Sequence, residues 1–563
     1  MKVKKWSEIF KPISLLNRLV LVTPLMYFGI LFENIRVNYS NVPYWDDWDS
    51  RISMNPKLHK VSFGYIWQQH NEHRIIFSKI LFLLDFVFFN GNGFPLLLLG
   101  VVIVLAIYGL FLYYILKLSP ILRKSQAKTI ALASLIGILL FSTMQNENFL
   151  WAFQSGFFLA ILLPMIAINT GYKYIQTHDK KYLVTSLLIS VCSMGTMASG
   201  LLTSVCIVLM FTIARVAKKI IFISIAISLL EFATYFSNYT SPNSSPLSVF
   251  FHHPTFVVKY VILYLSEPFT YIIHGENHLI WLLVSLIYIF TILRVLISMI
   301  SKKVPNIASS LVPLMVSIFV LLTAMVSAGG RYQFGVSQAT ASRYTSMSLT
   351  GWCCILTLMF ESIRIRNSSK YLLIPSILAL LLYNEQTGFL TIKDNQRFDR
   401  TISALALELN IKDNSQLKSI YPDPARVMEL AQVLITNNQS VFGEPTINQS
   451  KYYLGKKLDT SSFQHCLGNV DTSSNVTGDS KMRILVGWIY DKGRADTPLK
   501  VLSLDSTDTV TGYGLTGMLR SDVSVAISAH AQYSGFKMYS NQNKIVKVIG
   551  LKTNSSCFIN VDS

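Results

Sequence analysis

The sequence predicts a mainly α-helical membrane bundle of many spans, followed by a soluble α+β tail that ends in a small β-sandwich. Of its 563 residues, 51% are hydrophobic and 14% are charged, whereas soluble domains carry roughly 25% charged residues. The apolar residues form long blocks such as 94–116 and 307–328. Each block exceeds the roughly 18 residues that indicate a membrane-spanning helix. Beyond about residue 384 such blocks disappear and polar residues become frequent.

The number of spans follows from the apolar blocks and from the charge of the loops between them. Cytoplasmic loops are enriched in Lys and Arg, so we expect the basic N-terminus, Lys2 to Arg18, in the cytoplasm. If the charged pieces 75–89 and 256–273 crossed the bilayer, basic loops would fall outside; we expect both to lie along the outer membrane surface. About eleven spans remain, near 19–35, 94–116, 129–143, 152–170, 182–197, 201–214, 220–236, 279–298, 307–328, 347–363 and 371–384. Because the count is odd, the tail is expected outside.

The chain therefore divides into three predicted regions. Residues 1–384 form the transmembrane domain, and residues 385–464 form an extracytoplasmic helical linker region with apolar periodicity over 398–437. Residues 465–563 contain short alternating runs such as MRILVGWIYD, PLKVLSLDS and NKIVKVIGL, separated by turn residues. This pattern is typical of a small all-β sandwich.

The net charge of +19 does not indicate a nucleic-acid partner. A nucleic-acid-binding protein gathers its basic residues on one soluble surface, but here most Lys and Arg lie in short loops between apolar blocks. In such loops they orient membrane helices. We therefore expect no nucleic acid among the partners.

Two of the six cysteines, Cys466 and Cys557, lie in the tail. If the tail is extracytoplasmic, both are in an oxidising compartment. We predict a disulfide between them that closes a loop of roughly ninety residues, for which the chain-entropy model gives about 4–5 kcal/mol. Two free thiols are the alternative.

The first extracytoplasmic loop holds an unusual acidic and aromatic motif, Trp45, Asp46, Asp47, Trp48 and Asp49. Carboxylates can act as a general base or bind a divalent cation such as Mg²⁺ or Mn²⁺, and tryptophans can stack on a sugar. We expect both Asp46 and Asp47 to be exposed, so that replacing either with Asn costs little stability. The alternative is a solvated loop with an aromatic interface belt.

A second group of polar residues, His70, Glu72, His73 and Arg74, follows in the same loop. If the segment is helical, His70, His73 and Arg74 share a face and Glu72 points aside. We expect cationic and hydrogen-bonding roles towards a phosphate. Polar residues at a helix end that meet lipid headgroups are the alternative.

Two further polar elements are expected on the same side of the membrane. Glu147 and Trp151 would share one helical face with Gln154, and an acid near the hydrocarbon boundary is costly unless it has a partner or a function. The later loop carries Arg331, Arg343 and Tyr344. Arginines placed outside, against the usual charge bias, suggest an anion such as a lipid phosphate, although headgroup contacts would also explain them.

The order of these elements resembles a group of bacterial membrane proteins related to the superfamily C (GT-C) glycosyltransferases. The resembling strings are YWDDWD, QHNEHR, QNENFLWAFQ and the late GGRY…ASRY loop, and they cover about residues 1–385. The serotype-converting O-antigen glucosyltransferases of phages and prophages are functional relatives of this group. The resemblance implies a sugar donor on polyprenyl phosphate, with Asp46 or Asp47 as base or metal ligand and with Arg331 and Arg343 on the donor phosphate.

The resemblance also implies a location and a set of partners. The protein would lie in the bacterial inner membrane with a periplasmic tail and would transfer a hexose to a cell-surface glycan such as the O-antigen of lipopolysaccharide. Membrane lipid, a flippase and a donor-synthesising enzyme would be further partners. Two alternatives remain. The first is a transporter of a lipid-linked saccharide, which predicts more polar groups near mid-membrane than Glu231 and Glu361. The second is a non-catalytic envelope protein that binds polysaccharide, which predicts that Asp46 and Asp47 are dispensable.

Overall fold

The computed structural model is mainly helical and divides into two compact units. It describes residues 15–241, 246–273, 277–301, 309–363, 369–390, 395–552 and 555–561. The basic residues expected to orient the chain at its N-terminus, Lys2 to Lys11, and those at 302–303 and 364–366 lie outside the described residues. Unit 1 comprises Met1–Arg36, Ser62–Ile80 and Leu96–Leu390, and unit 2 comprises Val37–Val61, Leu81–Pro95 and Thr391–Ser563.

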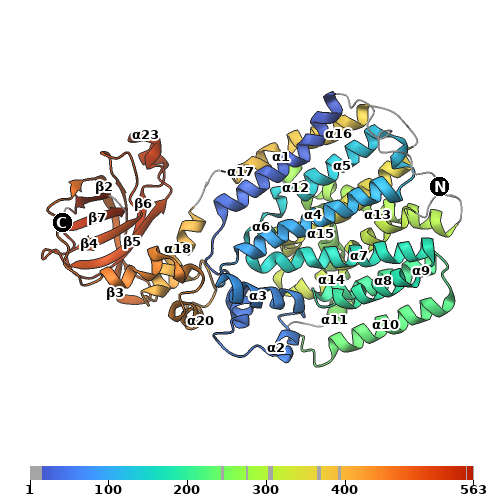
Figure 1. Ribbon diagram of the computed structural model, residues 1–563, viewed down its shortest axis with the longest axis horizontal. Coiled ribbons are helices and arrows are strands. Elements are labelled where there is room, and N and C mark those ends of the chain that lie inside the picture. Colours follow the sequence, from blue (N-terminus) through green and yellow to red (C-terminus); the bar gives the residue numbers. More distant parts are fainter. Residues whose placement is uncertain are drawn as a thin grey trace. The chain divides into compact units, whose positions relative to one another are not determined.

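Unit 1 is a bundle of helices that run side by side (Figure 1). Its long helices are α1 (Leu15–Asn38), α4 (Phe94–Tyr113), α5 (Gln126–Leu140), α7 (Ser155–Thr177), α8 (Lys180–Ser193), α9 (Leu202–Ile213), α10 (Lys218–Phe236), α12 (Pro254–Ile273), α13 (His278–Ile300), α14 (Leu311–Arg331) and α15 (Ser342–Ser362). Shorter helices are α2 (Phe63–Trp67), α6 (Asn146–Leu150), α11 (Pro246–His252), α16 (Leu373–Leu381) and α17 (Tyr383–Gly388), and α3 (Ile76–Phe89) is shared by the two units.

Eight helices in the described part of the chain are long and apolar enough to cross a membrane. They span Leu15–Asn38, Phe94–Leu118, Gln126–Leu150, Ala152–Thr177, Lys218–Phe236, Pro254–Ile273, His278–Ile300 and Leu311–Phe334. All except α12 coincide with spans predicted from the sequence, whereas α12 was expected to lie on the outer surface. The predicted spans near 182–197, 201–214, 347–363 and 371–384 are the helices α8, α9, α15 and α16, which are not among the eight. The total of about eleven spans and their orientation remain predictions.

The outward surface of the bundle is apolar, as a lipid-facing surface must be. On α10, Phe222, Leu229 and Leu230 are each more than 60% exposed, and Phe290 on α13 is equally exposed. Apolar side chains in such numbers on one surface are stable only against lipid or a partner. Several helices of this chain could therefore cross a membrane, which indicates a membrane protein.

The C-terminal part of unit 2 begins with helices that the sequence predicted over 398–437. They are α18 (Gln396–Glu408), α19 (Asn414–Leu417) and α20 (Pro424–Thr436), followed by α21 (Pro445–Asn448) and α22 (Ser450–Tyr453). Pro424 occupies the first turn of α20 and the Asp423 carboxylate accepts from the Ala425 and Arg426 N–H groups, which is a strong helix start. These helices form one apolar core with Trp48, Ile52 and Phe86 from the earlier segments of unit 2.

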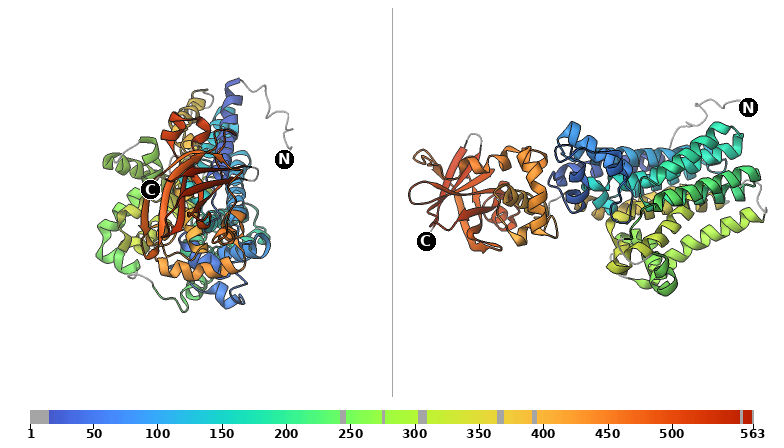
Figure 2. Two further views of the ribbon diagram at one scale, coloured as in Figure 1. Left: turned by 90° about the vertical axis from the view of Figure 1, so that its left-hand side faces the viewer. Right: turned by 90° about the horizontal axis from the view of Figure 1, so that it is seen from below.

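The tail ends in one eight-stranded sheet rather than in the two sheets of the predicted sandwich. The strand order is β1-β8-β7-β4-β5-β6-β3-β2, and the sheet curves into a half-barrel (Figure 2). The strands are β1 (Gln464–His465), β2 (Leu467–Val476), β3 (Asp479–Tyr490), β4 (Lys500–Leu504), β5 (Val510–Met518), β6 (Gly535–Asn541), β7 (Lys547–Lys552) and β8 (Ser555–Asn560).

Alternate residues of the strands explain why one sheet is enough. Leu502, Tyr513 and Ile549 point into the core shared with the helices, while their neighbours Val501 and Val548 point into a second core on the other face. The alternation that suggested a sandwich is therefore present, with successive residues directed to opposite faces. The helices α18 to α22 cover the face that a second sheet would have covered.

Cys466 and Cys557 form the disulfide expected from the sequence. Their Cα atoms are 5.3 Å apart and the sequence separation is 91 residues. β1 pairs with β8 in parallel, and Cys557 lies opposite Gln464 in that pairing. The bridge therefore fastens β8 to the residue that follows the edge strand β1.

Candidate functional site

The acidic motif of the first loop is divided between the interior and the surface of unit 2. Asp47 is 3% exposed, and its carboxylate accepts from Arg51 Nε at 2.8 Å and from the Tyr44 N–H at 3.2 Å. Arg51 Nη1 donates to Asp85 at 3.0 Å and to the Gly91 carbonyl at 3.0 Å. The expectation that Asp47 is exposed is wrong, because a buried arginine needs this carboxylate as a counter-charge.

The other residues of the motif follow the same division. Trp48 is fully buried in the core of unit 2, which removes it from contact with a sugar. Trp45 is 45% exposed and has a left-handed backbone with φ of 47°, and Asp46 is half-buried. Asp49 is exposed and accepts from the Tyr421 hydroxyl at 2.6 Å. The surface part of the motif is thus Trp45, Asp46 and Asp49.

The QHNEHR element belongs to unit 1 and is a tight turn, not the expected helix. The N–H of His70 donates to the His73 carbonyl at 2.8 Å, and the His73 N–H donates back to the His70 carbonyl at 2.9 Å. Asn71 provides the left-handed residue of the turn, with φ of 48°, a conformation that Asn tolerates better than most residues. Glu72 therefore lies at the tip of this turn and not on the side of a helix.

Arg74 anchors this turn to α10. Its guanidinium donates to the Tyr235, Trp67 and Ser237 carbonyls at 2.8, 2.9 and 2.6 Å. The side chain is buried, and its guanidinium lies 5.0 Å over the Trp67 ring. Because the guanidinium donates to three backbone carbonyls, Arg74 has a structural role, and we do not expect it to bind a phosphate.

Glu72 is paired with Arg331 at the last turn of α14. Their closest atoms are Glu72 Oε2 and Arg331 Nη2, 3.5 Å apart, and both side chains are partly accessible. The C-terminal end of a helix favours a cation. The next residue, Tyr332, stacks on the His253 ring at 4.4 Å, which fixes the end of α14.

Arg343 is held in a similar way at the start of α15. Its Nη1 lies 3.3 Å from Glu147 Oε1, its Nη2 donates to Gln338 Oε1 at 2.7 Å, and its backbone N–H donates to Glu147 Oε2 at 3.2 Å. Arg343 is also near enough to Arg331 to act on it electrostatically. We call Glu72, Glu147, Arg331, Arg343 and Gln338 the arginine cluster.

The remaining predicted residues support the cluster rather than join it. The Tyr344 ring is buried and packs on Tyr264 of α12 at 5.6 Å. Trp151 has an extended backbone between α6 and the short turn Ala152–Gln154, so the expected continuous helical face of Glu147, Trp151 and Gln154 does not exist. The Trp151 ring is buried against Phe153.

Two histidines of the turn are held neutral by their surroundings. Burial lowers the pKa of His70 to about 4, with a further contribution from His73. Burial also lowers the pKa of His73 to about 4, against the opposing effect of Glu72. The Ala198 N–H donates to His73 Nδ1 at 3.4 Å, which assigns the ring proton to Nε2. His73 is therefore a hydrogen-bond donor at neutral pH.

Among the described residues, no three His, Cys, Asp or Glu side chains gather as a metal site requires. The metal ligands expected from the sequence were Asp46 and Asp47, and the Asp47 carboxylate is occupied by Arg51. The divalent cation remains a prediction.

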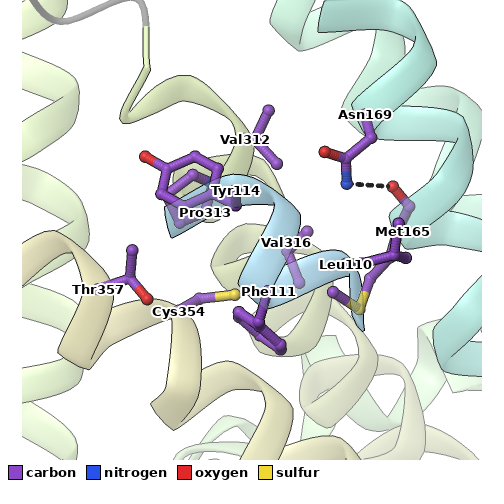
Figure 3. A pocket seen from close by; sticks show the side chains of 10 residues that line it. All are labelled: Leu110, Phe111, Tyr114, Met165, Asn169, Val312, Pro313, Val316, Cys354 and Thr357. Carbon is purple, nitrogen blue, oxygen red and sulfur yellow. Dashed lines mark hydrogen bonds between the residues drawn. The ribbon is translucent and has the colours of Figure 1, made fainter. Parts of the chain in front are cut away.

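A pocket inside unit 1 lies apart from all predicted site residues (Figure 3). Its walls come from α4, α7, α14 and α15 and are mostly apolar. Asn169 donates through Nδ2 to the Met165 carbonyl at 2.8 Å. The pocket holds no acid–base pair, and we assign it no chemistry.

No protein-family model matches this chain, and no curated protein matches its sequence significantly. The site must therefore be interpreted from its own geometry. The sequence did not reveal the role of Gln338, which accepts a hydrogen bond from Arg343. It also did not reveal Arg51, which pairs with Asp47 in the interior, or Asp85, which pairs with Arg51. The i, i+4 spacing of Asp47 and Arg51 was the available signal for that ion pair.

Proposed function

We propose that this chain is an integral-membrane glycosyltransferase that moves a hexose from a polyprenyl-phosphate donor to a cell-surface glycan on the extracytoplasmic face. The observation that carries the proposal is the arginine cluster. Two guanidinium groups lie at the ends of apolar helices, near enough to influence each other, and each has a carboxylate at 3.3–3.5 Å. Paired guanidiniums bind phosphate oxygens in a fixed geometry, and a lipid phosphate lies at the ends of membrane helices.

The reaction requires a base and a stabilised leaving group. The acceptor hydroxyl attacks C1 of the donor sugar, the bond between C1 and the phosphate oxygen breaks, and polyprenyl phosphate leaves with the electron pair. The base takes the hydroxyl proton, and Arg331 and Arg343 stabilise the charge that develops on the phosphate. Glu72 of unit 1 is our first candidate for the base, and Asp46 of unit 2 is the second.

The ion pair between Glu72 and Arg331 supports a donor-first order of binding. The donor phosphate is a diester with one negative charge and two unesterified oxygens. It can therefore take the place of the Glu72 carboxylate, which lies 3.5 Å from Arg331. When the phosphate binds Arg331, the Glu72 carboxylate can instead accept a hydrogen bond from the acceptor hydroxyl. The base is then available only when the donor is bound.

The test uses purified full-length protein in lipid nanodiscs and polyprenyl phosphate carrying radiolabelled glucose. Arg331→Lys and Arg343→Lys should each weaken binding of polyprenyl phosphate, because Lys lacks the planar fork. Arg123→Lys, an arginine in another loop, is the matched control and should bind normally. Unchanged affinity in both cluster variants would remove these arginines from the proposal.

Substitutions of the two acids distinguish the candidates for the base. Glu72→Gln should lower transfer by on the order of a hundredfold or more while binding of polyprenyl phosphate stays unchanged or tightens. If Asp46→Asn abolishes transfer and Glu72→Gln does not, the base is Asp46. Normal transfer by the Glu72→Gln/Asp46→Asn double variant would refute this mechanism.

A further inference from the structure

The buried face of α10 is polar from Ser224 to Tyr235, although α10 is apolar enough to cross a membrane. Its buried residues are Ser224, Ser228, Glu231 and Tyr235, which follow the i, i+4, i+7, i+11 spacing of one helical face. The neighbouring helix α8 has the same character, since its buried residues are Ser186, Ser190 and Ser193. Figures 1 and 2 show α8, α9 and α10 side by side.

We call these buried polar residues of α8 and α10 the polar seam. Glu231 lies in the middle of it and is 3% exposed. Its Oε1 accepts from the Ser190 hydroxyl at 3.2 Å. Ser204 of α9 adjoins the carboxylate and lies 2.9 Å from the Ser228 hydroxyl. Among the residues that the structure describes, Glu231 Oε2 has no hydrogen-bond partner.

A carboxylate in this position must be neutralised, because an isolated charge within a membrane costs several kcal/mol. The described residues provide no basic partner for Glu231. The sequence of α9 contains no charged residue, and the lysines of α10, Lys218 and Lys219, are at its opposite end, about 18–20 Å away at 1.5 Å per residue. Neutralisation must therefore come from a bound proton or from a small cation.

The arrangement of oxygen atoms suits a small cation. Glu231 Oε2 is buried and has no hydrogen-bond partner among the described residues, so it can serve as a ligand. The Ser190, Ser204 and Ser228 hydroxyls each keep a lone pair that can join it.

We propose that Glu231, Ser190, Ser204 and Ser228 form a binding site for a monovalent metal cation, with Na⁺ as the ligand. One carboxylate and three hydroxyl groups provide hard oxygen ligands and one negative charge, so the occupied site is neutral. Thus the polar seam is explained by a ligand rather than by helix packing alone.

The proposed site is one helical turn along α10 from Tyr235, and Tyr235 contacts the backbone turn that carries Glu72. Tyr235, four residues after Glu231, accepts from the Arg74 N–H at 3.1 Å and donates to the Glu72 carbonyl at 3.2 Å. A cation that holds α8, α9 and α10 together therefore also fixes Tyr235. We expect cation binding to reduce hydrogen exchange in residues 68–75.

The experiment measures the thermal unfolding midpoint of purified full-length protein in detergent, at constant ionic strength, in NaCl, KCl or N-methyl-D-glucamine chloride. At a hundredfold excess over its Kd, Na⁺ should raise the midpoint by about 5 °C. Binding of ²²Na⁺ should reach one ion per chain. Ser190→Ala should weaken Na⁺ binding several-fold, and Glu231→Gln should abolish it.

Glu361→Gln is the matched control, because Glu361 is another buried carboxylate of the bundle but accepts from four hydroxyl groups. It should retain the Na⁺ response. A wild-type midpoint that depends on pH but not on Na⁺ would assign a proton to Glu231 and overturn the proposal, as would an unchanged Na⁺ response in both Glu231→Gln and Ser190→Ala. None of these measurements depends on glycosyl transfer, so their outcome is separate from that of the proposed activity.

Discussion

Replacing Asp47 with Asn should destabilise unit 2, although the sequence motif suggests a catalytic acid. The Asp47 carboxylate accepts from Arg51 Nε and from the Tyr44 N–H, and the ion-paired side chains of Asp47 and Arg51 are 4% and 2% exposed. In Asp47→Asn the charge is lost, and the single amide oxygen cannot replace both acceptors. Arg51 keeps its contact with Asp85, so the buried guanidinium is not left without any counter-charge.

The magnitude follows from these contacts. A hydrogen bond to a charged group contributes about 1.5–3 kcal/mol, and we expect Asp47→Asn to cost about 2–3 kcal/mol. Arg51→Met should cost more, about 3–5 kcal/mol, because it leaves two buried carboxylates without their partner. For a folded unit of about 200 residues, each 1 kcal/mol lowers the unfolding midpoint by about 2–4 °C. The expected fall for Asp47→Asn is thus about 4–12 °C.

The assay is thermal unfolding of the full-length protein in detergent, with hydrogen exchange to localise the change. Exchange should accelerate in α18, α20 and the sheet, which share a core with Trp48. Asp46→Asn is the matched control, because Asp46 is adjacent but more exposed, and it should cost less than about 1 kcal/mol. Equal midpoints for the Asp46 and Asp47 variants would refute the structural role of the Asp47–Arg51 pair.

Three further measurements test other parts of the structure. His70 and His73 have folded-state pKa values of about 4, below the unfolded value of about 6.5. The stability of their turn should be fully present above pH 6.5 and should fall by about 1.4 kcal/mol per pH unit for each histidine as the pH drops towards 4; hydrogen exchange of residues 68–75 at pH 7.5 and 5 measures this, and equal exchange would contradict it. Replacing Cys466 and Cys557 with Ser should cost unit 2 up to about 4–5 kcal/mol, visible as faster proteolysis of the tail under non-reducing conditions, whereas reduction should leave the double variant unaffected. Gly200→Ala should prevent normal packing of α8 on α9, because its Cβ would lie 1.8 Å from a backbone carbonyl oxygen; an unaltered unfolding midpoint would show that the turn is more adaptable than the structure indicates.

Periodicity and composition were sufficient to predict most of the helices and the nature of the tail. The apolar blocks became helices because backbone groups in lipid must bond within their own segment, and the alternation in MRILVGWIYD became β3. The number of sheets could not be predicted in this way. Alternation shows that a strand has two distinct faces, but it does not show whether a helix or another sheet covers each face. In this chain the helices of 396–453 provide that cover.

The site was predicted less well, because a short polar motif does not show which of its side chains point to the interior and which to the surface. Asp47 and Asp46 are neighbours with the same chemistry, yet one is buried on Arg51 and the other is partly exposed. The deciding residue, Asp85, lies 38 positions later in an apolar helix, where an acid without a partner would be costly. The helical interpretation of QHNEHR failed for a similar reason. The Arg74 contacts to three carbonyls select a turn, and i, i+4 spacing cannot reveal contacts with a distant helix.

Charge balance connects the arginine cluster with the seam of α10. Both are places where a charge near apolar helices must have a partner, but the partners differ in kind. Arg331 and Arg343 each have a carboxylate at 3.3–3.5 Å, which we propose is displaced by the donor phosphate. Glu231 has hydroxyl groups but no cation among the described residues, so its neutralisation must come from solution. Tyr235 joins the two, because it belongs to the seam and bonds the backbone of Glu72. Under the two proposals, the turn that carries Glu72 would respond both to a phosphate bound at Arg331 and to a cation held between α8, α9 and α10.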